Sequence, residues 1–405
     1  MNFLFDLLST QEIGSIKYHG GGEYGKQVFW DIIGSDILHK QNFNFFVLYN
    51  NEIEMDSLIK EYIENHERIT CIHAKDFNGL KDILRENNIE RFYSPIPYYL
   101  PEVPGIHKIK KETKLLGTLH GLRKLEYPFD KYEKYFRNGF KAKLKYPVKR
   151  VLYDKYMKKE KNKIQQLLDL FNNKVLTVSK HSKYALCSMF ESLVPANIEV
   201  ATVIPQKLIV NTKRKNAATT ILKDLQIQKA KYFLLISSNR HEKNIVRVLK
   251  ALTDYRVLLK DGFKFLCLGM DSKIERKLRR DFPKALPCIV FQEYVLREEL
   301  EALYKNAYAF VYPTISEGFG YPPVEAMKYG TPVIASASTA VTEVCQNAAI
   351  YFNPFIPFEI ANRLNQLLHE PLLYNDYKTR GLDRFQQIVK EREEGKLKIY
   401  SYLFE

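Results

Sequence analysis

The chain has 405 residues, of which 45% are hydrophobic and 27% charged. These values are ordinary for a globular protein and exclude a mainly disordered chain, a collagen-like chain and a small disulfide scaffold. No apolar run approaches the roughly 18–20 residues that cross a bilayer. No basic residue precedes the apolar start of the chain, so we expect no secretory signal. At about 150 residues per domain, the length predicts two or three domains.

The five cysteines are scattered and form no C-x-x-C pair. An odd number without metal-binding spacing indicates reduced thiols of a cytoplasmic protein and predicts no zinc or iron–sulfur site. They are Cys71, Cys187, Cys267, Cys288 and Cys345.

The net charge of +15 is unevenly distributed, with −6 over residues 1–100 and +12 over residues 101–163. A local basic stretch can meet nucleic acid, anionic lipid or an acidic substrate. It can equally be a solvated face of the protein. Both interpretations stay open on charge alone.

Short apolar runs alternate with amphipathic stretches along the whole chain, which predicts βαβ units and parallel sheets. The predicted strands are 45–49, 69–73, 91–94, 115–120, 174–179, 232–237, 265–269, 288–291, 309–313 and 332–335. The predicted helices are 28–38, 55–65, 77–87, 244–255, 272–280, 297–306 and 324–329.

The fold class is therefore α/β, with two doubly wound domains. We expect an N-terminal Rossmann-like domain over 1–205 and a C-terminal one over 218–380. A linker over 206–217 lacks periodicity and is rich in lysine, and a helical tail over 381–405 is expected to return toward the first domain.

The most informative segment is the string SEGFGYPPVEAMKYGTPVI, Ser316 to Ile334, which follows a predicted strand. Gly318 and Gly320 let backbone amides approach an anion, and the next helix directs its positive end there. Glu317 lies in the loop and Glu325 in the helix, and carboxylates accept hydrogen bonds from sugar hydroxyls. The spacing predicts a phosphate cradle between two hydroxyl-binding acids at the carboxyl edge of a parallel sheet.

This string resembles the nucleotide-sugar motif of the retaining glycosyltransferases of family 4, which have the GT-B fold of two Rossmann-like domains facing each other across a cleft. The resemblance implies that Glu317 contacts the transferred sugar and that Glu325 holds the ribose. It also implies that the loop from Gly318 through Phe319 and Gly320 to Tyr321 faces the sugar and the diphosphate.

A second segment, ISSNRHEKN from Ile236 to Asn244, resembles the phosphate-binding loop of the same family. The resemblance implies that Lys243 binds donor phosphate as a point charge and that Arg240 assists it. The segment departs from the family pattern because Ser237 replaces a glycine and Glu242 stands where one form has arginine. A third departure is Glu293, where the family commonly has glycine.

In the first domain, a glycine cluster precedes a helical pattern, and a histidine ends a predicted strand. The resemblance places Gly21 and Gly22 beside the donor diphosphate. It assigns His120 to positioning the sugar or the acceptor, although a structural histidine is the alternative. The acidic residue that often follows the family's histidine is replaced by Gly121.

The resemblance implies a retaining, metal-independent transferase of the cytoplasm that moves a hexosyl or deoxyhexosyl unit, with mannose or rhamnose favoured. The expected partners are a nucleoside diphosphate sugar and a glycan or lipid-linked acceptor of cell-surface polysaccharide synthesis, with no cofactor and no nucleic acid. The basic, tyrosine-rich residues 123–163 suit the anionic inner face of a membrane. A catalytically degenerate sugar-nucleotide-binding protein and a GT-B epimerase or hydrolase remain alternatives.

Overall fold

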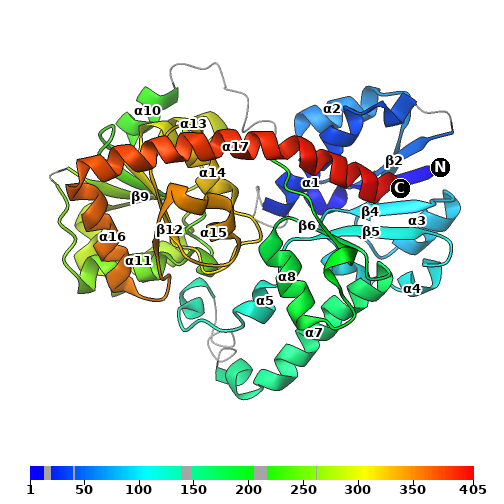
Figure 1. Ribbon diagram of the computed structural model, residues 1–405, viewed down its shortest axis with the longest axis horizontal. Coiled ribbons are helices and arrows are strands. Elements are labelled where there is room, and N and C mark those ends of the chain that lie inside the picture. Colours follow the sequence, from blue (N-terminus) through cyan, green and yellow to red (C-terminus); the bar gives the residue numbers. More distant parts are fainter. Residues whose placement is uncertain (13–19, 40–41, 138–146, 205–216, 261) are drawn as a thin grey trace. The chain divides into compact units, whose positions relative to one another are not determined.

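The computed structural model describes residues 1–12, 20–39, 42–137, 147–204, 217–260 and 262–405 (Figure 1). The chain divides into two compact units. The first unit comprises Met1–Leu122, Met157–Ile209 and Lys390–Glu405, and the second comprises Arg123–Tyr156 and Val210–Val389. Within the described part of the chain, no helix combines the length and apolar character needed to cross a membrane.

A seven-stranded, all-parallel sheet forms the centre of the first unit, in the order β3-β2-β1-β4-β5-β6-β7. Its strands are β1 (Asn2–Asp6), β2 (Asn44–Tyr49), β3 (Ile69–His73), β4 (Arg91–Ser94), β5 (Lys114–Leu119), β6 (Val175–Thr177) and β7 (Ile198–Val200). Its helices are α1 (Gly20–Ile33), α2 (Ser57–Asn65), α3 (Leu80–Glu86), α4 (Ile106–Ile109), α7 (Tyr153–Leu170, from Met157 on) and α8 (Lys180–Met189).

Aromatic rings fill the core on one face of this sheet. In register, Phe3 of β1 pairs with Phe45 of β2, and their rings stack with centroids 5.6 Å apart. Phe5 meets Phe29 of α1 edge-on at 5.8 Å, and Phe404 packs on Phe3 at 5.1 Å. Alternate residues of a strand point to the same face, so α1 and the end of the last helix cover the same side of the sheet.

The second unit contains a six-stranded parallel sheet in the order β10-β9-β8-β11-β12-β13. Its strands are β8 (Tyr232–Leu235), β9 (Lys264–Leu268), β10 (Ile289–Gln292), β11 (Ala309–Tyr312), β12 (Val333–Ser336) and β13 (Ala349–Phe352). Its helices are α5 (Arg123–Glu126), α10 (Ala217–Asp224), α11 (Ile245–Asp254), α12 (Ser272–Asp281), α13 (Arg297–Asn306), α14 (Tyr321–Lys328), α15 (Ala340–Cys345), α16 (Pro357–His369) and α17 (Pro371–Phe404, to Val389).

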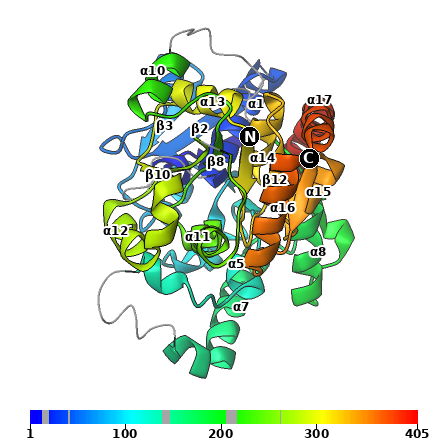
Figure 2. The same ribbon diagram turned by 90° about the vertical axis from the view of Figure 1, so that its left-hand side faces the viewer.

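Helices cover both faces of the second sheet (Figure 2). On one face, Phe233 and Leu235 of β8 share a buried cluster with residues of α11, α12 and α16. On the other face, Phe310 of β11 meets Tyr304 of α13 edge-on, with ring centroids 5.4 Å apart. Because helices cover both faces, every residue of Tyr232–Leu235 is buried. Strands buried on both faces are apolar throughout.

In both sheets, the first strand of the unit lies between its second and fourth strands, which is the Rossmann order. From β1 the chain continues to β2 on one side of this pair of strands, whereas from β4 it continues to β5 on the other side. In the second sheet, β8 leads to β9 and β11 to β12 in the same way. Open α/β sheets bind ligands beside the carboxyl ends of strands at such a reversal. The predicted class of two doubly wound α/β domains is confirmed.

The compact units differ from the predicted domain ranges in two places. Residues 123–156, expected within 1–205, belong to the second unit, because the buried pair Asp130–Arg247 binds this segment to α11. The predicted tail 381–405 is divided between the units: the part from Lys390 on belongs to the first unit, as expected, whereas residues 381–389 belong to the second. The predicted linker 206–217 lies outside the described residues except at Ala217, where α10 begins.

The helix predicted over 28–38 begins earlier, at Gly20, and ends at Ile33. Glycine is a poor helix former, so the cluster appears as a loop in the sequence. Packing overrides that preference, since a Cβ on Gly25 would lie only 2.7 Å from Pro95 Cγ and Thr10 Cγ2. Gly21 and Gly22 therefore lie in the first turn of α1, not in a loop before it.

Candidate functional site

The string from Ser316 to Ile334 forms the strand, loop and helix that its sequence predicts. β11 ends at Tyr312, and α14 begins at Tyr321 with proline in its first turn. Gly320 has a φ of 104° and Gly330, just past the helix, a φ of 65°. Both values lie in the left-handed region that favours glycine. The loop thus presents the amino end of α14 at the carboxyl edge of the sheet.

Glu317 is held in this loop by three polar contacts. Its Oε1 accepts a hydrogen bond from Lys243 Nζ at 2.6 Å and from Thr314 Oγ1 at 2.9 Å. Its backbone N–H donates to Thr339 Oγ1 at 2.9 Å. Lys243 Nζ also donates to the hydroxyl of Tyr312 at 3.1 Å. The carboxylate and the ammonium predicted for sugar and phosphate are therefore brought together.

The surroundings lower the pKa of both Glu317 and Lys243. Burial alone raises the pKa of Glu317, but Lys243, Arg240 and Arg123 outweigh it, and the pKa falls below its usual value. Burial lowers the pKa of Lys243, with Glu317 opposing the fall and Arg240 adding to it. Glu317 is accordingly a firmly ionised carboxylate at neutral pH.

Glu242 is the centre of a second charged group in the loop after β8. Its Oε1 accepts from Arg240 Nε at 2.8 Å and from Arg123 Nη1 at 2.5 Å, and its Oε2 lies 3.1 Å from His241 Nδ1. Burial favours the neutral acid, but the hydrogen bond from His241 and the charges of Arg240 and Arg123 hold the pKa of Glu242 well below its usual value. This acid is therefore a counter-ion for two guanidinium groups.

The two loops are joined through the backbone of Glu242. Its carbonyl oxygen accepts from Ile315 N at 2.9 Å and lies 3.1 Å from Thr314 Oγ1, whose single proton goes either here or to Glu317. Ser237, which replaces a glycine of the family pattern, has a φ of 54°, so it keeps the left-handed backbone that glycine favours. The departure at Ser237 therefore leaves the turn intact, at a cost of about 1–2 kcal/mol. Glu293, the third departure, is exposed at the end of β10.

The predicted ribose ligand, Glu325, lies buried in the middle of α14. Its Oε1 accepts from Arg297 Nη1 at 2.8 Å, and Arg297 Nε also donates to Glu301 at 3.3 Å. Burial opposes the charge of Arg297, but Glu325 and Glu301 reverse this and raise its pKa. Between the two acids, Phe319 is buried against Tyr321, with ring centroids 5.1 Å apart. Gly318 is half-buried.

The candidates of the first unit lie together at the carboxyl edge of its own sheet. A Cβ on Gly21 would lie 3.5 Å from His120 Nε2, and Gly22 is buried in the next position of α1. His120 Nε2 lies 2.8 Å from the carbonyl oxygen of Pro95 and, because a carbonyl oxygen only accepts, donates its proton there. Tyr24 meets the ring edge-on at 5.1 Å.

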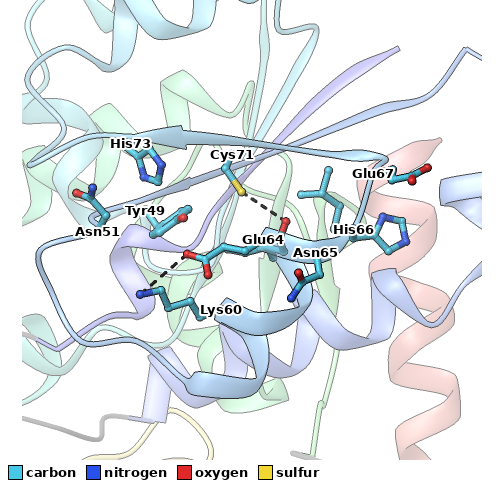
Figure 3. Close-up of a pocket in the computed structure, with 11 residues that line it drawn as sticks. Tyr49, Asn51, Lys60, Glu64, Asn65, His66, Glu67, Cys71 and His73 are labelled. Atoms are coloured by element: carbon cyan, nitrogen blue, oxygen red, sulfur yellow. Dashed lines mark hydrogen bonds and ion pairs between the residues drawn. The ribbon is translucent and has the colours of Figure 1, made fainter.

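A cavity of about 680 Å³ lies elsewhere in the first unit, between α2 and the edge strand β3 (Figure 3). Lys60 faces Glu64 at its rim at 4.0 Å, and Cys71 Sγ donates to the carbonyl of Ile63. The ring of Tyr49 meets that of His73 edge-on at 4.6 Å. Most of its lining belongs to α2 and to the edge strand, two strands away from the reversal between β1 and β4.

Sequence reasoning missed several residues of the second unit's site. Thr314 precedes the motif, and Thr339 and Arg297 come from other elements. Arg123 lies four positions after Leu119, the last residue of β5. The surplus of cations after residue 101 pointed to the region of Arg123, but no spacing singled it out.

Comparisons with known proteins agree with this arrangement. Residues 218–384 match the family Glycosyl transferases group 1. An O-antigen chain mannosyltransferase, RfbU of Salmonella typhimurium, is 35% identical over 131 residues, or 31% of this chain and 35% of its own. The O-antigen chain mannosyltransferase B of Escherichia coli is 27% identical over 225 residues, 54% of this chain and 57% of its own. The matched part thus spans from about a third to little more than half of these relatives.

Among solved structures, sucrose-phosphate synthase from Thermosynechococcus elongatus aligns with 100% of this chain and 99% of its own, at a TM-score of 0.70 and 14% identity. HepE of Anabaena, in complex with UDP-glucose, aligns over 99% and 100%, at 0.66 and 14%. These likenesses extend over both units and confirm the GT-B fold. Residues 218–384 of this chain are thus similar to the Glycosyl transferases group 1 family, and the similarity to solved structures extends over both units.

Proposed function

We propose that this protein is a glycosyltransferase that moves a mannosyl unit from a nucleoside diphosphate sugar to a glycan or lipid-linked acceptor in the synthesis of a cell-surface polysaccharide. The observation that carries the proposal is the contact of Lys243 with Glu317 inside a group 1 glycosyl transferase domain. The names of the relatives, O-antigen chain mannosyltransferases, support mannose as the sugar.

Each residue of the site is assigned to one part of the donor. Glu325, in the middle of α14, accepts hydrogen bonds from the ribose hydroxyls. Lys243, Arg240 and the amides around Gly318–Gly320 face the diphosphate, and Glu317 accepts a hydroxyl of the sugar. Gly21, Gly22 and His120 belong to the first unit, where His120 positions the sugar or the acceptor.

Transfer proceeds with retention, by attack on the face that the diphosphate leaves. The acceptor oxygen forms a bond to the anomeric carbon as the bond from that carbon to the diphosphate oxygen breaks. The acceptor proton passes to the departing diphosphate, which leaves as the nucleoside diphosphate. Fixed cations that meet the developing charge lower the barrier. Lys243 and Arg240 supply that charge, so the reaction needs no metal ion.

A thermal-shift panel of GDP-, UDP-, dTDP- and ADP-sugars tests the site. A ligand that binds only the folded state adds about 2.7 kcal/mol of stability at a hundredfold excess over Kd. We expect one nucleotide to raise the melting temperature of the wild type and to have much less effect on Glu325→Ala. No shift with any of them contradicts the proposal.

Turnover of the nucleotide that binds separates the remaining possibilities. We expect sugar transfer to saccharide lipids from a cell envelope, with the anomeric configuration retained by NMR. Binding without turnover would instead indicate a degenerate site. Donor consumption at full rate without acceptor would indicate a hydrolase or an epimerase.

We further infer that residues 147–156 dock this protein, which we place in the cytoplasm, on the anionic inner face of a membrane. Val151 is 84% exposed, and apolar side chains flanked by cations suit an anionic interface. The exposed apolar residues are Val148, Val151, Leu152 and Tyr153, and the cations beside them are Lys149, Arg150 and Lys155.

Vesicle flotation tests this docking. We expect the wild type to float with phosphatidylglycerol vesicles more than with phosphatidylcholine vesicles, and Val151→Asp to lose that preference. Val194→Asp, at another exposed valine, is the matched control. Equal flotation with both vesicles, or none with either, contradicts the inference.

A further inference from the structure

Residues 123–136 follow the last residues of β5 in the chain but are bound to the phosphate loop of the second unit. Arg247 Nη1 and Nη2 donate to Asp130 at 2.7 and 3.3 Å, and both side chains are buried. Arg247 also donates to Asn244, the residue that precedes α11. The rings of Phe136 and His241 lie 6.4 Å apart. The segment is therefore fixed relative to residues 240–247.

These contacts place Arg123 beside the carboxylate of Glu242, which also binds Arg240. Oε1 of Glu242 accepts from Arg123 Nη1, from Arg240 Nε and from Arg240 Nη2. A carboxylate oxygen has two lone pairs, so three donors exceed what this atom can fully satisfy. One of these N–H groups can turn to another acceptor at little cost.

Arg123 is the member of the group best placed to do so. Its side chain is 41% exposed, against 28% for Arg240 and 7% for Lys243. Its Nε is buried and has no hydrogen-bond partner among the residues that the structure describes. A buried donor without an acceptor is unfavourable, and an incoming oxygen atom can supply the missing acceptor.

The charges around the loop also leave room for an anion. Among the ion pairs of the described residues, Arg123 and Arg240 share the carboxylate of Glu242, and Lys243 pairs with Glu317. Glu242 occupies the position where one form of the family pattern has arginine. Arg123, 119 positions away in the chain, therefore places a guanidinium beside the loop position where that form of the pattern has arginine.

We propose that Arg123 is a ligand of the donor's diphosphate, held ready by Glu242 and supplied by residues 123–136. This rests on the proposed function of the second unit as a nucleoside diphosphate sugar site. A planar guanidinium binds phosphate oxygens in a forked geometry. Glu242 is a positioning residue, since it acts on the donor only through the two arginines.

Calorimetric titration of the full chain with GDP, UDP and the nucleosides guanosine and uridine tests this ligand. We expect Arg123→Ala to weaken binding of the preferred diphosphate at least tenfold and to leave the affinity for its nucleoside within twofold. Arg123→Lys, which keeps the charge and loses the fork, should recover part of the loss. The matched control is Arg256→Ala, an exposed arginine of the same unit.

The outcomes separate this proposal from the one it rests on. If the wild type binds neither diphosphate, the proposed function fails, and the role of Arg123 fails with it. If the wild type binds and Arg123→Ala binds equally well, only the role of Arg123 is overturned. An equal loss of nucleoside and diphosphate affinity also overturns it, since Arg123 would then act on the fold of the site. Urea unfolding of each variant shows whether it is folded.

Discussion

Lys243 and Glu317, 74 positions apart in the chain, form an ion pair of 2.6 Å at the carboxyl edge of the second sheet. The pair joins the loop after β8 to the loop after β11, the two strands at the reversal of that sheet. Both side chains are largely removed from water, so each charge depends on the other. A ligand that binds here meets a carboxylate and an ammonium that are already oriented.

The substitution Glu317→Gln keeps the size of the side chain and removes its charge. We expect kcat to fall by about 100-fold or more, as when one group that stabilises a transition state is lost. Nucleotide affinity should change less than threefold, because Glu317 is assigned to the sugar. Steady-state kinetics and calorimetric titration measure the two effects. Glu370→Gln, an exposed acid of the same unit, should leave both unchanged. A full-rate Glu317→Gln enzyme would refute the assignment.

The buried pair of Asp130 and Arg247 predicts a large loss of stability on removal of one partner. Asp130→Ala leaves the guanidinium of Arg247 without its carboxylate, and we expect unfolding of the second unit to be about 3–5 kcal/mol easier. Urea unfolding followed by circular dichroism measures the change. Asp154→Ala, at an exposed acid, is the control and should change stability by less than about 0.5 kcal/mol. Equal stability of the two variants would contradict the anchoring of residues 123–136.

Glu242 predicts a specific dependence of stability on pH. Its pKa is lower in the folded protein than its ordinary value of 4.5, so the folded state binds its proton more weakly than the unfolded state. The stability that it adds is complete above pH 4.5 and is lost as the pH falls below that value toward the folded pKa. The free-energy difference between the wild type and Glu242→Gln should therefore be constant from about pH 5.5 to 7 and shrink by about 1.4 kcal/mol per pH unit below 4.5.

Urea titrations of both proteins at pH 7, 5.5, 4 and 3.5 measure this difference. An exposed pair such as Lys396 and Glu393 supplies the control, because Glu393→Gln should show little difference at any pH. A difference that grows as the pH falls would mean that burial, rather than the arginines, decides the charge of Glu242.

Substitution by alanine is expected to have different effects at Gly381 and Gly395, the two glycines of α17. A Cβ on Gly395 would lie 2.2 Å from the carbonyl oxygen of Thr202, whereas one on Gly381 would lie 3.4 Å from Met327. Alanine is favoured over glycine inside a helix by about 1 kcal/mol. We expect Gly381→Ala to be neutral or slightly stabilising and Gly395→Ala to cost about 1–3 kcal/mol. Thermal unfolding compares them, and an equally stable Gly395→Ala would contradict the close approach of α17 to Thr202.

Much of the fold could be predicted because local patterns and long-range packing agree. The strands expected over 69–73 and 91–94 and the helix expected over 297–306 have the predicted bounds in the structure. Three strands were not predicted: β1 begins and ends in polar residues, β7 has three residues, and β13 follows only a short turn of helix. Their place is fixed by parallel neighbours that lie far away in the chain.

The site could be predicted only where its residues lie close together in sequence. Glu317, Gly320 and Glu325 belong to one string, and Lys243 to another. Arg123 is 119 positions from Glu242, and no local pattern connects them. The basic stretch after residue 101 is also not one surface, because part of its charge neutralises acids of the second unit, as Arg123 does at Glu242 and Arg137 at Glu133.

The central claim is that the loops joined by Lys243 and Glu317 bind a nucleoside diphosphate sugar. Calorimetric titration of GDP-mannose into the wild type and into Lys243→Met tests it most directly, with Lys250→Met as the matched control at a half-buried lysine of α11. We predict saturable one-to-one binding by the wild type and the control, and an affinity at least tenfold weaker for Lys243→Met. Equal affinity in all three proteins would contradict the account.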